Sequence, residues 1–113
     1  MGACLFCRVV AGEVPAEVVH ETARTLAFRD ITPQAPTHVL VVPRDHHEDV
    51  EALTDADPAL AGELLVAAVA VARQEGLTGG HRLVVNTRGD GGQTVFHLHV
   101  HVLGGRGLGW PPG

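Results

Sequence analysis

Polar and apolar residues alternate one by one along residues 97–103, which read His-Leu-His-Val-His-Val-Leu. Because successive side chains of a β-strand point to opposite faces, this pattern predicts a strand with three imidazoles on one face and aliphatic side chains on the other. An edge strand with a solvated face accounts well for one histidine and poorly for three in alternation. Imidazole acts as nucleophile, acid, base or metal ligand near neutral pH, so the pattern favours a functional site.

The remaining hydrophobic pattern predicts one long helix and further strands. Apolar residues recur at spacings of three and four between Leu60 and Val71, with Asp57 as N-cap, Pro58 at the first helical position and Gly76 after the end. A short helix over 4–10, a helical turn over 48–53 and four strands complete the expected elements, the strands spanning 18–21, 25–29, 38–43 and 81–86. This order predicts an α+β domain with a five-stranded antiparallel sheet and one long helix packed on it.

Length and charge narrow the class of protein. A chain of 113 residues with 45% hydrophobic residues predicts a single domain over residues 1–113. The net charge of −5, without a basic run, argues against binding of a nucleic-acid backbone. We find neither a signal peptide nor an apolar run long enough to span a membrane, and we therefore expect a cytoplasmic protein.

A glycine-rich loop, Gly-Asp-Gly-Gly-Gln-Thr at 89–94, precedes the histidine strand. Such a loop alone favours a flexible hairpin connection, but next to three histidines it favours a cradle of backbone N–H groups for phosphate. Asn86 ends the preceding strand and could face the same anion. Asp30, before a proline-rich loop, could accept sugar hydroxyls or cap its own turn, and taken alone the capping role is favoured.

Cys4 and Cys7 stand in Cys-x-x-Cys spacing, which is typical of a zinc site or of a redox pair. The redox alternative calls for a strand before the first cysteine, and no strand is predicted there, so metal is favoured. A closed zinc site needs two more ligands, and spacing does not choose them among the other histidines.

These motifs together resemble the histidine triad (HIT) proteins. The resemblance runs over nearly the whole chain and includes the triad at 97–103, Asp-Ile-Thr-Pro-Gln-Ala-Pro-Thr-His at 30–38, and Asn86 with Gly-Gln-Thr at 92–94. The ending, Leu-Gly-Gly-Arg at 103–106 and Trp-Pro-Pro-Gly at 110–113, is similar to the Hint branch of nucleoside phosphoramidases.

The resemblance implies a hydrolase that splits the P–N bond of purine nucleoside 5′-phosphoramidates through a covalent nucleotidyl-histidine, with no catalytic metal. It implies His99 as the nucleophile, His101 as the group that holds phosphate oxygen and assists the leaving group, and His38 as the support of the His99 imidazole. It also implies a homodimer in which the central helix and the 81–86 strand pack against their copies, so that the sheet continues across the two-fold axis.

The resemblance further implies two sets of binding residues. The nucleotide would be held by residues of the base wall, the ribose site, the phosphate cradle and the tail, namely Phe6, Phe28, Asp30, Ile31, Asn86, Gly92, Gln93, Thr94 and Trp110. One structural Zn²⁺ per chain would be held by Cys4, Cys7, His46 and His97.

Two residues depart from the family pattern. Thr94 stands where Ser is frequent, and Phe96 stands where Tyr is common. Both changes concern substrate preference and rate rather than reaction class. The alternatives are hydrolysis of dinucleoside polyphosphates or adenylyl sulfate by the same nucleophile, and a non-catalytic, zinc-stabilised nucleotide-binding module that acts through partners.

Overall fold

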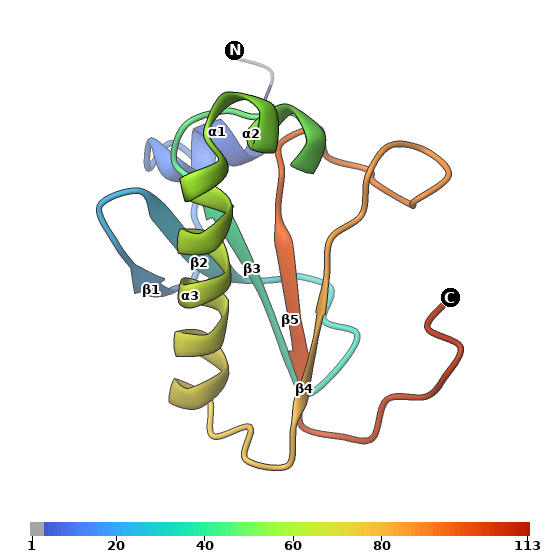
Figure 1. The fold of residues 1–113 in the computed structure, drawn as a ribbon. Helices are drawn as coiled ribbons and strands as arrows, with labels where there is room; N and C mark the ends of the chain where they lie inside the picture. Colours follow the sequence, from blue (N-terminus) through green and yellow to red (C-terminus); the bar gives the residue numbers. More distant parts are fainter. Residues whose placement is uncertain (1–3) are drawn as a thin grey trace.

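The structure is a computed structural model that describes residues 4–113. Three helices and five strands follow one another along the chain (Figure 1), with the bounds α1 Leu5–Val10, β1 Val18–Glu21, β2 Thr25–Arg29, β3 Thr37–Pro43, α2 Val50–Ala56, α3 Pro58–Gln74, β4 His81–Val84 and β5 Val100–Gly104. The predicted α+β class, with a five-stranded antiparallel sheet, one long helix and a short N-terminal helix, is confirmed.

The five strands pair in the order β1-β2-β3-β5-β4, and every pairing is antiparallel. The expected hairpin of β1 and β2 is present, and β3 lies at the centre because its β-branched residues are buried on both sides. Its neighbour β5 carries His101 opposite Leu40 of β3. The centre of the sheet therefore supports the last histidine of the triad.

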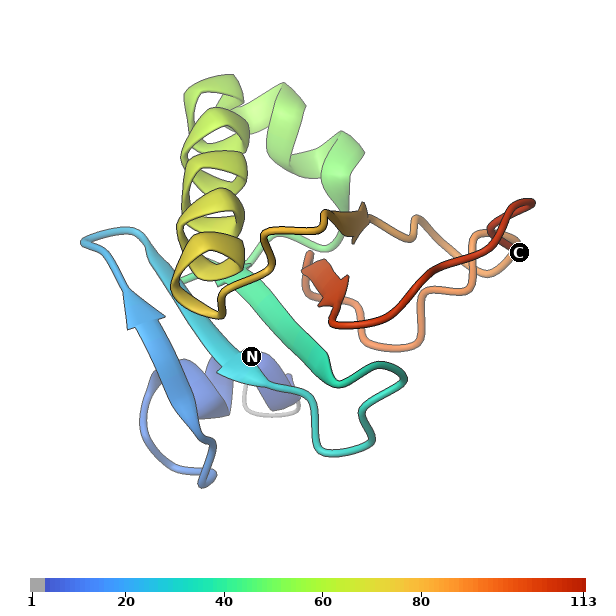
Figure 2. The same ribbon diagram turned by 90° about the horizontal axis from the view of Figure 1, so that it is seen from below.

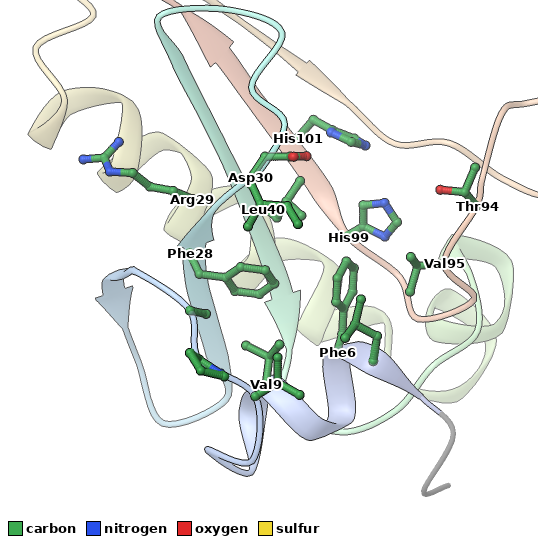
Figure 3. A pocket seen from close by; sticks show the side chains of 15 residues that line it. Phe6, Val9, Phe28, Arg29, Asp30, Leu40, Thr94, Val95, His99 and His101 are labelled. Atoms are coloured by element: carbon green, nitrogen blue, oxygen red, sulfur yellow. The ribbon is translucent and has the colours of Figure 1, made fainter.

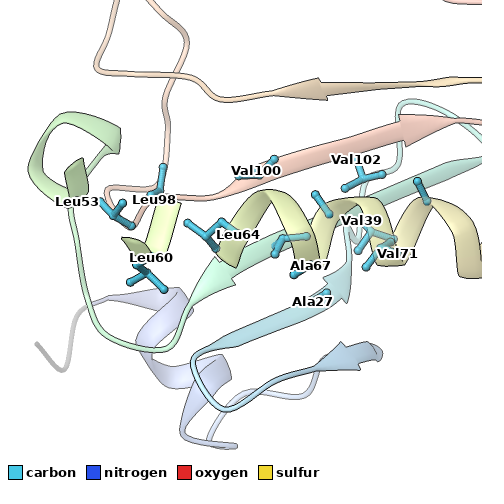
Figure 4. Packing of buried hydrophobic residues seen from close by; sticks show 13 residues of the cluster. Ala27, Val39, Leu53, Leu60, Leu64, Ala67, Val71, Leu98, Val100 and Val102 are labelled. Atoms are coloured by element: carbon cyan, nitrogen blue, oxygen red, sulfur yellow. The ribbon is translucent and has the colours of Figure 1, made fainter. Parts of the chain in front are cut away.

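Helices cover both faces of the sheet, α3 on one side and the short α1 on the other (Figure 2). The side chain of Asp57 accepts a hydrogen bond from the Leu60 N–H, and Pro58 opens α3, as the sequence predicts. The core beneath α3 contains the aliphatic residues that alternate with the histidines (Figure 4): Leu98, Val100 and Val102. The second core, beneath α1, contains Phe6 and Phe28.

Three elements, β5, β4 and α2, differ from their predicted bounds by two residues or more, and α1 and β3 begin one residue away from the prediction. Strand β5 begins at Val100 rather than at residue 97, because Pro43 has no N–H to donate to a longer ladder and its carbonyl accepts from His97 Nε2 instead. The N–H of Leu98 donates to the carbonyl of His47, outside the sheet, at 2.7 Å. Strand β4 ends at Val84, two residues earlier than expected.

The third difference concerns α2, which was predicted as one turn over 48–53 and spans Val50–Ala56. Its N-cap is Asp49, whose carboxylate accepts from the Ala52 N–H at 2.9 Å. Among the described residues, no helix is both long and apolar enough to cross a membrane.

Candidate active site

A pocket of about 270 Å³ opens on the face of the sheet that carries α1 (Figure 3). Its wall is formed mainly by apolar side chains of α1, β2 and β3, and its polar groups gather at one end. Five residues predicted to bind the nucleotide line it, namely Phe6, Phe28, Asp30, Ile31 and Thr94, together with His99 and His101. A pocket with an apolar wall and a few convergent polar groups suits a flat, partly apolar ligand.

The imidazole of His99 presents a free lone pair to this pocket. Its Nδ1 lies 2.8 Å from the carbonyl oxygen of His97. Because a carbonyl only accepts, Nδ1 carries the hydrogen, and the neutral ring keeps its lone pair on Nε2. The ring of Phe6 packs edge-on against His99, with centroids 5.1 Å apart. The strand backbone thus fixes both the tautomer and the orientation of the predicted nucleophile.

His38 and His101 form a hydrogen-bonded pair whose polarity is also fixed. The backbone N–H of Gln34 donates to His38 Nδ1 at 3.0 Å, so neutral His38 carries its hydrogen on Nε2. That Nε2 lies 2.9 Å from His101 Nδ1, which therefore accepts. His38 thus supports the ring of His101, whereas the resemblance implied that it supports the ring of His99. The hydrogen of His101 is left on Nε2, a buried atom with no hydrogen-bond partner among residues 4–113. An unpartnered buried donor at the pocket is suited to an anionic ligand.

Asp30 has the capping role, one of the two roles that its sequence position suggests as alternatives. One carboxylate oxygen accepts from the Thr32 N–H at 2.8 Å and caps the turn. The other lies 3.5 Å from His38 Nε2, and the side chain lines the pocket. The capping interaction is therefore confirmed, and it leaves the carboxylate at the pocket edge.

Burial keeps the triad neutral. Desolvation lowers the pKa of His101 from its ordinary value of 6.5 to about 4, and the neighbouring His99 and His38 add to the shift. Desolvation also lowers the pKa of His38 and of His99, although the carboxylate of Asp30 opposes both shifts. Neutral imidazoles are required for the tautomers described above.

These shifts predict a stability that depends on pH. Between pH 6.5 and about 4 the unfolded chain binds a proton at His101 that the folded protein does not, so stability should fall as the pH falls through this window. Urea unfolding at matched metal content should show a lower midpoint at pH 4.5 than at pH 7. His101→Asn should reduce this slope, and His81→Gln, at an exposed strand position, should leave it unchanged. If the urea midpoint depended on pH equally in all three proteins, the lowered pKa of His101 would be contradicted.

Several predicted nucleotide residues lie outside the pocket. The side chain of Gln93 joins its own loop to the segment before α2, donating to the carbonyls of Glu48 and Val95 and accepting from the Arg88 N–H. Asn86 and Gly92 are not among the lining residues, and Trp110 is 84% exposed on the C-terminal tail. Their contacts with a nucleotide stay predictions.

The sequence reasoning missed eight of the wall residues, among them Leu40 and Val95 beside the histidines. Leu40 could have been found from the alternation of β3, because His38 and Leu40 are two residues apart and share a face. Val95 follows an irregular loop, and no periodicity indicates where its side chain points.

The four predicted metal ligands, Cys4, Cys7, His46 and His97, come together, with their donor atoms within 4.8 Å of one another. The Nδ1 of His97 lies 3.3 Å from Cys4 Sγ and 3.5 Å from Cys7 Sγ, and the Nδ1 of His46 lies 3.4 Å from Cys7 Sγ. Since thiolate and imidazole ligands of a tetrahedral zinc ion stand roughly 3.5 Å apart, the spacing fits such an ion.

The chemistry of the donors also fits a metal ion. His97 donates from Nε2 to the carbonyl of Pro43 at 2.9 Å, which leaves a lone pair on Nδ1 toward the cysteines. Burial and the neighbouring Cys4 raise the pKa of Cys7 to about 11, so the metal-free thiol is protonated at neutral pH. A bound metal would hold the thiolate and release that proton.

A second group, Asp30, His38 and His101, also brings metal-type ligands together. A metal there would require a lone pair on His38 Nε2. The Gln34 N–H instead places the lone pair on Nδ1 and the hydrogen on Nε2. We therefore interpret this group as a hydrogen-bonded chain rather than as a metal site.

Comparison with known proteins agrees with the fold and the triad. Residues 11–108 match the model of the HIT domain family. An uncharacterized HIT-like protein of Synechococcus elongatus is 50% identical over 109 residues, which cover 96% of each chain. A 14 kDa zinc-binding protein of Zea mays is 45% identical over 111 residues, which cover 96% of this chain and 87% of the maize protein.

Solved structures give the same result. The crystal structure of a HIT family hydrolase from Legionella pneumophila superposes with a TM-score of 0.93 at 50% identity, covering 97% of this chain and 99% of the other. A histidine triad protein from Clostridium difficile superposes with a TM-score of 0.90 at 38% identity, covering 94% and 93% of the two chains. With its matched family model, its close relatives and its triad at the pocket, the chain belongs to the HIT domain family.

Proposed function

We propose that the protein hydrolyses purine nucleoside 5′-phosphoramidates by nucleotidyl transfer to His99 and then to water. One observation carries the proposal: the Nδ1–H of His99 is bound by the His97 carbonyl, which leaves an Nε2 lone pair at the pocket beside the unpartnered Nε2–H of His101. A fixed neutral imidazole is a competent nucleophile toward phosphorus, and an adjacent donor stabilises charge on the phosphoryl oxygens.

The proposed reaction has two displacements. His99 Nε2 forms a bond to the α-phosphorus as the P–N bond breaks, and the amine leaves with the electron pair and takes a proton from water. Water then attacks phosphorus, the bond to His99 breaks, and the lone pair returns to Nε2; the proton that this water loses neutralises the hydroxide left when the amine was protonated. His101 Nε2–H donates a hydrogen bond to a phosphoryl oxygen in both steps, and the His97 carbonyl steadies the cationic ring of the intermediate.

The pocket supports a nucleoside beside this phosphate. The aromatic rings of Phe6 and Phe28, with centroids 5.4 Å apart, form an apolar wall for a base. The carboxylate oxygens of Asp30 stand at the pocket edge, where ribose hydroxyls could donate to them. A nucleoside has an aromatic base for the apolar wall and hydroxyl groups for the single carboxylate, so the pocket favours a nucleoside over a purely polar ligand.

We further propose a structural zinc ion and a homodimer. The ion would be held by the two cysteines of α1, His46 and His97, and it would join α1 to the catalytic segment without taking part in the reaction. The maize relative bears the name of a zinc-binding protein. The dimer is supported by β4 at the edge of the sheet and by exposed apolar residues beside it on α3 and after β4: Leu65, Val66 and Val85.

A substrate panel tests the proposed activity. Purified protein is incubated with adenosine 5′-phosphoramidate, a diadenosine polyphosphate and adenylyl sulfate, and release of AMP is followed by chromatography. We expect the phosphoramidate to have the highest kcat/KM. Faster hydrolysis of either other substrate would replace the P–N assignment by the corresponding alternative. Nucleotide binding without turnover of any of them would favour the non-catalytic module.

A further inference from the structure

The hydrogen bond that fixes the polarity of the His38–His101 pair comes from a loop, and the structure shows what holds that loop. Gln34 donates its N–H to His38 Nδ1 from the segment between β2 and β3. We call the chain from the Gln34 N–H through His38 to His101 Nε2 the imidazole relay. The direction in which hydrogens are donated along this relay depends on one backbone N–H. The Gln34 N–H fixes the tautomer of His38, and the tautomer of His38 in turn fixes that of His101.

Reversal of the relay would place a lone pair, in place of a hydrogen, at His101 Nε2. In the relay as it stands, His38 Nε2 donates across the 2.9 Å contact to His101 Nδ1. If His38 carried its hydrogen on Nδ1, its Nε2 would accept, His101 would donate from Nδ1, and His101 Nε2 would face the pocket without a hydrogen. That lone pair would repel an anionic phosphate. The position of the Gln34 N–H therefore decides whether His101 Nε2 presents a hydrogen, which attracts the phosphate of the proposed substrate, or a lone pair, which repels it.

Arg106 binds this loop from outside it, at the peptide group that directly follows the one whose N–H donates to His38. Its Nη2 donates to the carbonyl oxygen of Gln34 at 2.9 Å, and its Nη1 donates to the Gly107 carbonyl at 2.9 Å. Gly105, the residue before it, lies so close to the loop that an added Cβ would stand 2.8 Å from Pro36 Cβ. The turn after β5 thus contacts the loop between β2 and β3 and forms a hydrogen bond to it through the guanidinium of Arg106.

We infer that Arg106 is a positioning residue that sets the polarity of His101 through the Gln34 backbone and His38. Arg106 is exposed and does not line the pocket, so it has no contact with the nucleotide site among the described residues. No carboxylate of residues 4–113 forms an ion pair with it, and it instead binds two carbonyls, one of them on the residue that supplies the first N–H of the relay. A charged donor gives a stronger hydrogen bond to a carbonyl than a neutral one.

The direct test is the tautomer of His38, observed by nitrogen NMR of protein with ¹⁵N-labelled histidine. In the parent protein Nδ1 of His38 should be unprotonated and Nε2 protonated. Arg106→Ala should add a population with protonated Nδ1, and Arg106→Lys, which keeps a cationic donor, should restore the parental pattern in part. This readout needs no substrate, so it stands even if the proposed function fails.

The kinetic test rests on the proposed function. Arg106→Ala should lower kcat for the phosphoramidate about tenfold, the effect of one lost hydrogen bond to a charged group, with KM changed less than about twofold. The control is Arg44→Ala, since Arg44 also donates to a backbone carbonyl, that of Thr22, at 3.0 Å in the β1–β2 hairpin. It should leave both the tautomer and kcat unchanged.

Two results would overturn the inference. A parental tautomer and kcat in folded Arg106→Ala would show that the loop holds itself. Equal loss of kcat in Arg44→Ala would show a general effect of stability. Should Arg106→Ala fail to fold, Arg106→Gln keeps a neutral donor of similar reach and answers the same question.

Discussion

His99→Ala should lower the rate of phosphoramidate hydrolysis by at least about 10³-fold, because the covalent route loses its nucleophile. The loss should appear in kcat, since the aromatic wall and Asp30 would still bind the nucleoside. The ring of His99 is 7% exposed and packs against Phe6, so some stability is lost as well. The measurement is single-turnover kinetics with a folded variant, verified by circular dichroism.

The covalent intermediate allows a second measurement of the same residue. Acid quenching of the parent protein during turnover, followed by digestion and mass spectrometry, should place a nucleotidyl group on the peptide that contains His99. The matched control is His81→Ala, at an exposed position on β4, which should retain parental kinetics. Turnover of His99→Ala at the parental rate, or an adduct on another residue, would show that the nucleophile is wrongly assigned.

Loss of the metal should be the largest effect on stability. We expect about one zinc ion per chain in protein purified without chelator, as a closed four-ligand site implies. With zinc in roughly 100-fold excess over its Kd, removal should lower the free energy of unfolding by about 3 kcal/mol. The effect should concentrate at α1, because a helix of six residues has little stability of its own. Hydrogen exchange of the α1 amides would locate it.

Two adjacent histidines provide a matched pair for the metal experiment. His46 belongs to the ligand cluster and His47 does not. His46→Gln should lose zinc and stability, and His47→Gln should keep both. The absence of zinc from the parent protein by elemental analysis would contradict the site, and zinc content that is equal in both variants would remove His46 from it.

Much of this architecture follows from the local pattern of the chain. The helix α3 was predicted because its N-cap, its first-turn proline and its apolar periodicity agree with one another. The β1–β2 hairpin was predicted with its observed bounds for a similar reason. The bounds of β5 were not, because they depend on Pro43 and His47, which are distant in sequence and accept the hydrogen bonds of His97 and Leu98.

Some features of the candidate site could likewise be predicted from the sequence, and others depend on contacts between distant residues. Alternation alone places His99 and His101 on one face, and the resemblance to HIT proteins supplied His38 and the two histidines of the metal cluster. Neither source indicated the tautomers, because these depend on which backbone group each ring nitrogen meets. The contact between Arg106 and Gln34 was equally hidden, since it joins residues 72 positions apart through an exposed side chain.

The alternation along β5 also determines which changes of chain length this protein can survive. A deletion of one residue between Val100 and Gly104 would turn every preceding side chain to the opposite face, so that histidines would enter the aliphatic core and valines would line the pocket. At Gly104 a Cβ would stand 2.7 Å from Leu77 Cδ1, so a shift that placed a larger residue there would force the Leu77 side chain to move. Gains and losses of single residues should therefore be eliminated by selection within the triad strand.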